Sequence, residues 1–183
     1  MKHVKRLLLV LVAGFLSACV VWEPVRYSPE AAVPVEAAVA AFQQQPELEP
    51  LFSGAVAYAV FPGSLRAGTG FGGAYGTGWL FEDSAVTGKV QMVEFFAGVD
   101  FGAQMYRSIL FFRTDKSLRN FKKGSFEFTG QANAAHVVGG KTATPSYHPD
   151  VAMFVQVRGG LLLEASVGTQ RYDFFPLAPA ASQ

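Results

Sequence analysis

The 183-residue chain has one cysteine, three histidines and few charged residues, which make up 16% of the sequence. A single cysteine excludes a disulfide framework and a multi-cysteine metal site. The three histidines lie far apart, and none belongs to a metal-ligand motif such as H-E-x-x-H. We therefore expect no catalytic residues, no metal site and no cofactor.

The chain is rich in apolar residues, which make up 50% of it, and it contains 19 glycines and 17 phenylalanines. This composition excludes a disordered chain and favours strands that pack closely over a helical bundle. The length is that of one domain with a sizeable core.

The first 18 residues have the pattern of a secretory signal. Lys2, Lys5 and Arg6 precede an apolar run over residues 7–16, which is too short to span a bilayer. The sequence Leu16-Ser17-Ala18-Cys19 then resembles the bacterial lipobox, in which cleavage leaves a lipid-modified cysteine at the new N-terminus. The alternative is an ordinary signal peptide with an incidental cysteine. We predict a lipoprotein signal peptide at 1–18, an acyl anchor on Cys19 and a tether over 19–32.

Loss of the signal peptide changes the charge of the chain. Residues 19–183 hold 12 Lys and Arg against 14 Asp and Glu, a net charge of −2 instead of +1. Acyl chains such as palmitate, at about 0.8 kcal/mol per buried methylene, make membrane attachment effectively permanent. We expect a location in a bacterial cell envelope, facing the periplasm, and favour the outer membrane over the inner one.

A helix is predicted to begin at Ser28-Pro29-Glu30, with Pro34 restarting or delaying it. Apolar residues at i, i+3, i+4 and i+7 form one stripe of this helix, which consists of Val35, Ala38, Val39 and Phe42. The helix is predicted to end at Gln43 to Pro46, before a second helical turn at 47–52. Because no Lys or Arg lies between Arg26 and Arg66, we expect this helix to pack on a sheet and not on a membrane.

Glycine recurs at alternate positions over residues 68–79. The stretch contains a formal G-x-G-x-x-G match, but a dinucleotide loop must turn directly from a strand into a helix. Period two instead predicts an extended strand with one nearly bare face, formed by Gly68, Gly70, Gly72, Gly76 and Gly78. Such a face lets another backbone, a helix or a flat apolar ligand in an adjacent groove come unusually close.

The remaining strands are read from apolar runs and their breaks. Residues 55–61 form a strand ending in a turn at Pro62-Gly63, and strands at 90–96 and 99–112 have breaks at Asp83-Ser84 and Gly98. Residues 109–112 are apolar on both faces, as in a strand covered on both sides. Strands at 151–158 and 161–167 flank Gly159-Gly160, which predicts a tight hairpin.

Between these strands, Thr114-Asp115 is predicted to cap a short helix that carries Leu118 and Phe121 and stops at Gly124. Phe126 and Phe128 open a further strand, and residues 139–149 form a polar loop.

The order of these segments resembles the SYLF domain family. The similarity lies in residues 55–62 (AVAYAVFP), 67–73 (AGTGFGG), 75–79 (YGTGW), 98–106 (GVDFGAQMY), 109–112 (ILFF), 117–121 (SLRNF), 154–161 (FVQVRGGL) and 164–168 (EASVG). It covers about residues 33–172, so we expect a SYLF-like domain at 33–176 and a C-terminal tail at 177–183.

The resemblance implies a β-rich α+β domain that binds lipids and, in yeast relatives, actin. Bacterial members are commonly envelope lipoproteins, which agrees with Cys19. Eukaryotic members are thought to contact phosphoinositides through a basic amphipathic N-terminal helix, but the corresponding region here has no basic face. Actin binding does not suit an exported bacterial protein, and we discard it.

One local excess of positive charge stands out from a chain that is otherwise slightly acidic. Residues 113–123 carry a net charge of +4, with Asp115 opposing the candidate lipid-headgroup residues Arg113, Lys116, Arg119, Lys122 and Lys123. Near an anionic membrane each cation contributes about 1 kcal/mol. The alternative is a solvated helix face. Nucleic-acid binding is not expected, because the chain has no overall positive field.

We therefore expect an α+β fold with an antiparallel, β-rich, barrel-like core on which N-terminal and short connecting helices pack. The expected function is lipid or membrane binding by an anchored envelope protein that is not an enzyme. The alternative is a structural envelope protein whose domain binds a protein partner, for example through an exposed sheet edge.

Overall fold

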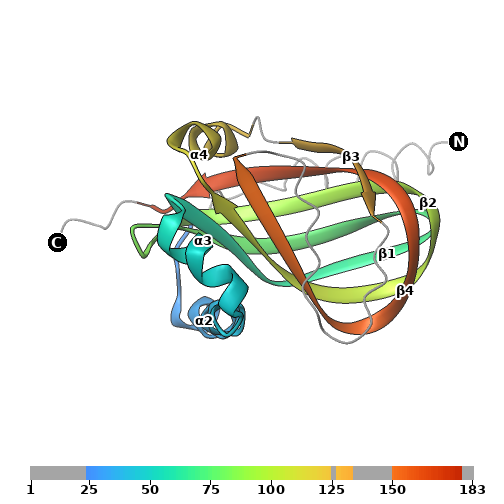
Figure 1. Cartoon of the computed structure of the whole chain (residues 1–183), viewed down its shortest axis with the longest axis horizontal. Coiled ribbons are helices and arrows are strands. Elements are labelled where there is room, and N and C mark those ends of the chain that lie inside the picture. The colour runs from blue at the N-terminus through green and yellow to red at the C-terminus, as the bar shows by residue number, and fades with distance from the viewer. Residues whose placement is uncertain (1–23, 125–126, 134–149, 179–183) are drawn as a thin grey trace, which may run out of the picture.

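The computed structural model describes residues 24–124, 127–133 and 150–178, with the backbone alone at 99–100, 127–133 and 160–167. Cys19, Phe126 and the predicted loop at 139–149 lie outside these ranges. The elements in chain order are α2 (Pro29–Gln43), the 3-10 turn η1 (Pro46–Leu48), α3 (Glu49–Gly54), β1 (Ala57–Glu82), β2 (Ala85–Phe112), α4 (Asp115–Lys122), β3 (Glu127–Asn133) and β4 (Val151–Pro176) (Figure 1). The α+β class is confirmed.

The strands form one antiparallel sheet in the order β1-β2-β4-β3. Three of them are unusually long, with 26, 28 and 26 residues in β1, β2 and β4. Straight strands of this length would extend about 85 Å, at about 3.3 Å per residue. They instead bend near their middles and curve back over themselves (Figure 1). Among the described strands β1 and β3 are the two edges, so the sheet is not closed and the expected barrel-like core is an open, strongly curved sheet.

Three predicted strand breaks are wrong, because the neighbouring strand pairs on both sides of each. Pro62-Gly63 coincides with a register shift between Phe61 and Ser64 in β1, an edge strand whose outer side tolerates a proline that lacks an N–H. Gly98 pairs with Ser166 inside β2, and Gly159-Gly160 continue β4 beside another register shift. These residues belong to bends, not to turns.

The predicted break at Asp83-Ser84 is confirmed as the turn between β1 and β2. Both residues have left-handed backbone angles, with φ of 48° and 65°. Two consecutive positive φ values suit the tight turns that join antiparallel strands without disturbing their twist.

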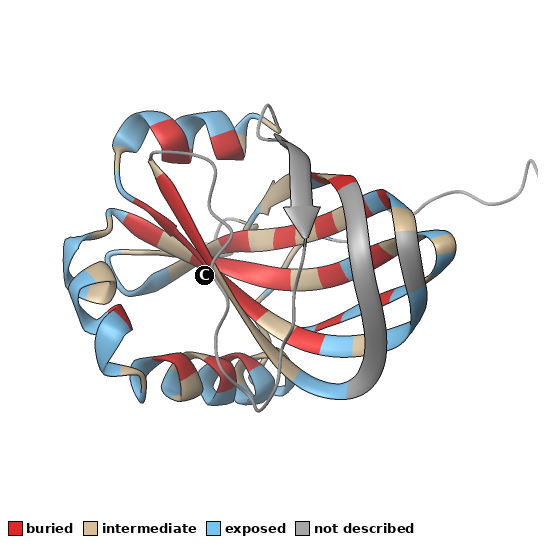
Figure 2. Cartoon of the chain, turned by 45° about the vertical axis from the view of Figure 1, so that its right-hand side comes forward, coloured by how far each residue is buried: buried red, intermediate tan, exposed pale blue. Residues whose placement is uncertain are grey.

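The bends bring the two halves of the long strands face to face, and the main core fills the space between these two layers (Figure 2). Its buried members are Ala57, Ala59, Phe61, Ala74, Leu80, Val90, Met92, Tyr106, Leu110, Phe112, Leu118, Phe121, Val151, Met153 and Tyr172. The residues at 109–112 have no exposed surface, which confirms a strand segment covered on both sides.

A second core lies outside the main one, under α2, η1 and α3, and it includes residues of both halves of β1, such as Val60 and Trp79. The side chain of Ser28 caps α2 by accepting a hydrogen bond from the Ala31 N–H at 3.3 Å. Val35, Ala38 and Phe42 are buried against Val60, Ile109 and Phe111. The prediction that this helix packs on the protein's own sheet is therefore confirmed.

The short helix α4 also follows its prediction. The Thr114 hydroxyl accepts a hydrogen bond from the Ser117 N–H at 3.2 Å, and Gly124 ends the segment with φ of 68°. Leu118 and Phe121 are buried in the main core, so the opposite side of α4 faces solvent.

Candidate functional site

The glycine-rich half of β1 packs against the first half of the same strand. A Cβ at Gly78 would collide with the Val60 carbonyl oxygen and would lie 2.8 Å from the Phe61 ring, while one at Gly76 would collide with Ser64. The predicted close approach of another backbone is therefore confirmed, and that backbone belongs to β1 itself. The prediction that a ligand groove lies beside these two glycines is wrong, because the protein's own atoms fill the space.

The other predicted glycines lie around the bend. Cβ atoms at Gly68 and Gly72 would both lie under 3.0 Å from the ring of Phe96. Gly70 has φ of 84° at the register shift between Thr69 and Phe71, and a Cβ there would lie 3.9 Å from the Gly98 carbonyl oxygen. These glycines permit the sharp curvature and the placement of Phe96, and they leave no room for an inserted ligand.

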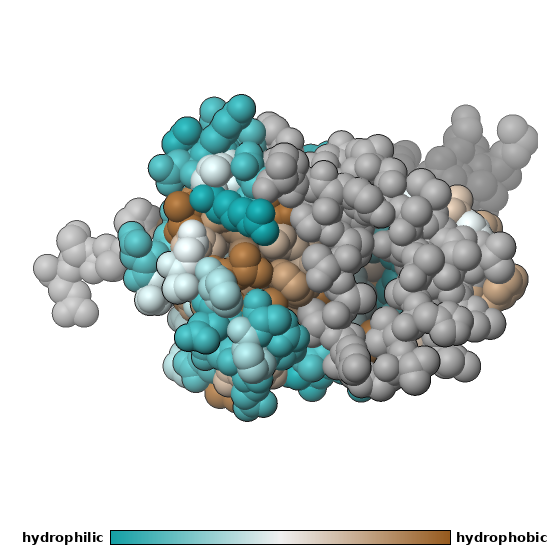
Figure 3. Space-filling view, in the orientation of Figure 1, coloured by the Kyte–Doolittle hydropathy of each residue, from teal (hydrophilic) through white to brown (hydrophobic). Residues whose placement is uncertain are grey.

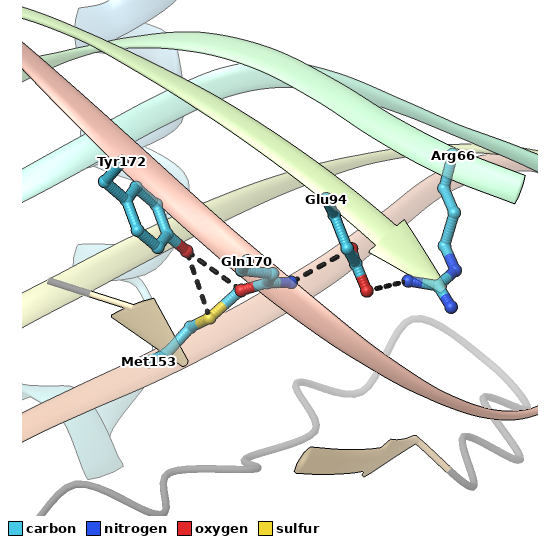
Figure 4. Close-up of polar contacts among 5 residues, drawn as sticks. All are labelled: Arg66, Glu94, Met153, Gln170 and Tyr172. Atoms are coloured by element: carbon cyan, nitrogen blue, oxygen red, sulfur yellow. Dashed lines mark hydrogen bonds and ion pairs between the residues drawn. The ribbon is translucent and has the colours of Figure 1, made fainter. Parts of the chain in front are cut away.

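A chain of buried polar side chains crosses the interior near this bend (Figure 4). Arg66 pairs with Glu94, and its guanidinium carbon lies 3.7 Å from the centroid of the Phe96 ring. The Gln170 amide donates a hydrogen bond to the second Glu94 oxygen at 3.0 Å. The Tyr172 hydroxyl donates to the Gln170 carbonyl oxygen at 3.0 Å. The chain thus connects the bend of β1 to β2 and β4.

This network of polar side chains is shielded from solvent. Each of its four members is at most 4% exposed: Arg66, Glu94, Gln170 and Tyr172. Burial, with smaller contributions from Tyr106 and Glu94, holds the pKa of Tyr172 well above its usual value. The phenol therefore stays protonated and keeps donating its hydrogen bond. We infer that this polar network stabilises the fold.

Sequence reasoning missed the network. Its one available signal was Glu94, a carboxylate in phase with the apolar residues Val90 and Met92 of the same strand. A charged residue at an inward position requires a buried partner.

The outer surface of the bend carries large apolar side chains that are open to solvent. We call this set the apolar bend; it consists of Leu65, Phe71, Tyr75, Phe95, Phe101 and Met105, which are 53–77% exposed. The register places Leu65 directly opposite Met105 and Phe101 opposite Thr69, so the residues of β1 and β2 form one surface. Most atoms at the right-hand end of Figure 3 are grey, and the few coloured ones there are pale to tan.

The apolar bend is poor in charge. Between Ser64 and Trp79 the one charged residue of β1 is Arg66, whose side chain is buried. The facing stretch of β2, residues 91–105, contains Glu94, which is also buried, and Asp100. Contiguous apolar surface of this kind typically marks a contact with a membrane or another protein.

The basic residues of the predicted headgroup site lie on and beside α4, at the end of the molecule opposite the bend (Figure 1). Lys116, Arg119 and Lys123 are exposed and, at i, i+3 and i+7, share one face of the helix. Arg113 is exposed just before the helix.

Lys122 does not belong to this basic face, which corrects its assignment as a candidate. Its ammonium lies 2.5 Å from Glu82 in an ion pair, and it also lies 5.6 Å from the centroid of the Phe174 ring. The cause is the helical period, which turns position 122 toward the sheet beside Phe121.

Within the described ranges, no helix is both long and apolar enough to cross a membrane. The same ranges contain no group of three or more His, Cys, Asp or Glu side chains placed to hold a metal ion. No family model, curated protein or solved structure matches the chain.

Proposed function

We propose that this chain is a lipid-anchored envelope protein whose folded domain binds a membrane surface through the apolar bend. The single observation that carries the proposal is the exposure of six large apolar side chains on a surface poor in charge. Burying a fully exposed Phe side chain contributes about 1.5–3 kcal/mol. Phe71 and Phe95 are 77% and 72% exposed, so their transfer into the interfacial region of a bilayer would provide most of the binding.

The anchor and the bend serve different tasks in this proposal. Cys19 lies five residues before Pro24, a separation of at most about 18 Å along an extended chain. The acyl chains hold the protein in the envelope, and the apolar bend gives the domain a second, reversible contact with lipid. The exposed cations of α4 lie at the other end of the domain, so binding through them to anionic headgroups is an alternative to binding through the bend.

A second candidate function is binding of a protein partner by the same domain. It is favoured by β1, which forms one edge of the sheet over 26 residues next to the apolar bend. An edge strand can accept a further strand from another chain. Vesicle binding discriminates between the two functions.

Replacing Phe71 and Phe95 together by serine is expected to weaken vesicle binding by at least tenfold, because both side chains leave the lipid interface. The measurement is co-sedimentation of residues 20–183, which keep every described helix and strand, with vesicles of phosphatidylcholine alone or mixed with phosphatidylglycerol. Binding through the bend depends little on the anionic fraction, whereas binding through α4 would rise with it.

The matched control is Val33→Ser, since Val33 is 69% exposed but lies on α2, away from the bend. This variant is expected to bind as the unmodified chain does. Absence of binding to either vesicle at low salt would refute the membrane proposal and leave the protein-binding alternative. If Lys116→Glu/Lys123→Glu lost vesicle binding while Phe71→Ser/Phe95→Ser kept it, the membrane contact would lie on α4 and not on the bend.

Cys19→Ser is expected to abolish acylation, because the hydroxyl of serine does not form the thioether that lipoprotein maturation requires. Metabolic labelling with a palmitate analogue, followed by mass spectrometry of the mature N-terminus, measures this. A Cys19→Ser protein that is still cleaved after Ala18 and still labelled would refute the anchor.

A further inference from the structure

A pocket lies on the outer face of the sheet, near the turn between β1 and β2. Its volume is about 590 Å³, and it is lined by Pro24, Val25, Arg26, Trp79 and Lys89. Trp79 of β1 and Lys89 of β2 are direct partners in the register of these two strands. The segment that carries Arg26 is held in place by the Ala178 N–H, which donates a hydrogen bond to the Val25 carbonyl oxygen at 2.9 Å.

Of the residues that the structure describes around the pocket, two are cations and none is a carboxylate. Within the described part of the chain, neither Arg26 nor Lys89 forms an ion pair or a side-chain hydrogen bond. This contrasts with Arg66 and Lys122, which are both paired with glutamates. Guanidinium and ammonium groups only donate hydrogen bonds, so together they suit an oxyanion.

Trp79 gives the pocket a fixed apolar wall. Its side chain is mostly buried, and the Tyr27 ring packs edge-on against it with 4.8 Å between ring centroids. Burial, and to a smaller extent the charge of Glu36, raises the pKa of the Tyr27 phenol. Glu36 is not among the described residues that line the pocket.

We propose that this pocket binds a phosphate-type anion, with Arg26 and Lys89 as the ligating cations and Trp79 as the wall against which the ligand's apolar part packs. Arg26 suits a phosphate because its planar guanidinium donates two parallel hydrogen bonds. A pocket of this size accepts a phosphate ester with a small organic group. The phosphate comes either from a soluble ester or from a lipid headgroup.

The position of the pocket bears on the second source. Its first lining residue, Pro24, lies five residues after Cys19. If the proposed anchor is present, the pocket lies within reach of the headgroups of the anchoring membrane. The headgroup source therefore rests on the proposed function, whereas anion binding by the pocket does not.

The test uses the full chain in uncharged detergent and the fluorescence of Trp79. The chain has two tryptophans, so Trp22→Phe leaves Trp79 as the sole reporter. The titrants are inorganic phosphate and, in separate arms, mixed micelles that contain phosphatidylglycerol or phosphatidylcholine. Sodium chloride at matched ionic strength shows the response to salt alone.

A saturable change in Trp79 fluorescence with phosphate is expected, at least tenfold weaker in Arg26→Gln/Lys89→Gln. The matched control, Lys116→Gln/Lys123→Gln, removes two exposed cations that do not line the pocket and is expected to leave the response to inorganic phosphate unchanged. A response to phosphatidylglycerol far stronger than to phosphate identifies a lipid headgroup, and the reverse identifies a soluble ester.

The site is refuted if sodium chloride gives the same change, if no titrant gives a saturable one, or if the pocket variant responds like the unmodified chain. Circular dichroism confirms that the pocket variant is folded, as expected for changes at an exposed arginine and a half-buried lysine. Phe71→Ser/Phe95→Ser keeps the phosphate response, so failure of the membrane proposal and failure of the anion site are separate results.

Discussion

Replacing Glu94 by glutamine is expected to lower the free energy of unfolding by about 3–5 kcal/mol, because removal of one partner leaves a buried charge uncompensated. The carboxylate of Glu94 is 1% exposed and neutralises Arg66, which is 4% exposed. Glutamine keeps the size of the side chain but not its charge. For a protein of this length the loss corresponds to a fall in Tm of about 6–20 °C, at about 2–4 °C per kcal/mol.

The measurement is urea unfolding of residues 20–183, followed by fluorescence and circular dichroism. Two variants control it. Glu36→Gln removes an exposed carboxylate and is expected to cost less than about 0.5 kcal/mol. Arg66→Met/Glu94→Leu removes both charges and is expected to recover most of the stability, since replacing a buried pair by apolar side chains is often neutral. Equal stability of Glu94→Gln and Glu36→Gln would show that the pair is not buried in solution.

Replacing Gly78 by alanine is expected to cost about 3 kcal/mol, the upper part of the usual range for an overpacked core. The added methyl would collide with the Val60 carbonyl oxygen and press on the Phe61 ring. A backbone carbonyl cannot move aside as a flexible side chain can, so the two halves of β1 must separate. The same urea unfolding experiment measures the loss.

Gly63→Ala is the matched control in the same strand, because a Cβ at Gly63 meets nothing within 4 Å. It is expected to be neutral or to stabilise the protein by about 0.4–1 kcal/mol, because alanine lowers the conformational entropy of the unfolded chain. A second check uses Gly76, where the obstacle is the side chain of Ser64. Ser64→Gly should restore stability lost in Gly76→Ala. If Gly78→Ala were as harmless as Gly63→Ala, the two halves of β1 would not be in contact.

Sequence patterns predicted the features that depend on neighbours along the chain. The stripe of α2, the cap of α4 at Thr114 and the strand break at Asp83-Ser84 each follow from local spacing and residue type over a few positions. The alternating glycines correctly indicated a strand with a close neighbour, because only backbone approach requires one bare face.

Features that depend on distant partners were not predictable in this way. Pro62-Gly63 and Gly159-Gly160 have the composition of turns, yet the pairing of β2 on both sides keeps each strand continuous. Arg66 and Glu94 are 28 positions apart, and Gln170 is a further 76 positions away. No local pattern connects them.

The apolar bend was missed for a different reason. Residues such as Phe71 and Phe95 alternate as core residues do, and a pattern of period two does not tell which face of a strand is covered. Their exposure follows from the position of the bend, beyond the reach of α2 and α3 (Figure 2). The pocket beside Trp79 likewise requires the meeting of residues near both ends of the chain.

The continuity of the long strands has a consequence for how the protein unfolds. Residues 57–61 of β1 belong to one layer and residues 74–82 to the other, with unbroken strand between them. Neither layer can detach without breaking backbone hydrogen bonds between the strands at the bends, where the two layers are continuous. Local opening, which in many proteins releases a hairpin or a single layer as a unit, is therefore suppressed here. The two layers form one cooperative unit, and its most protected amides belong to the strands that run through both.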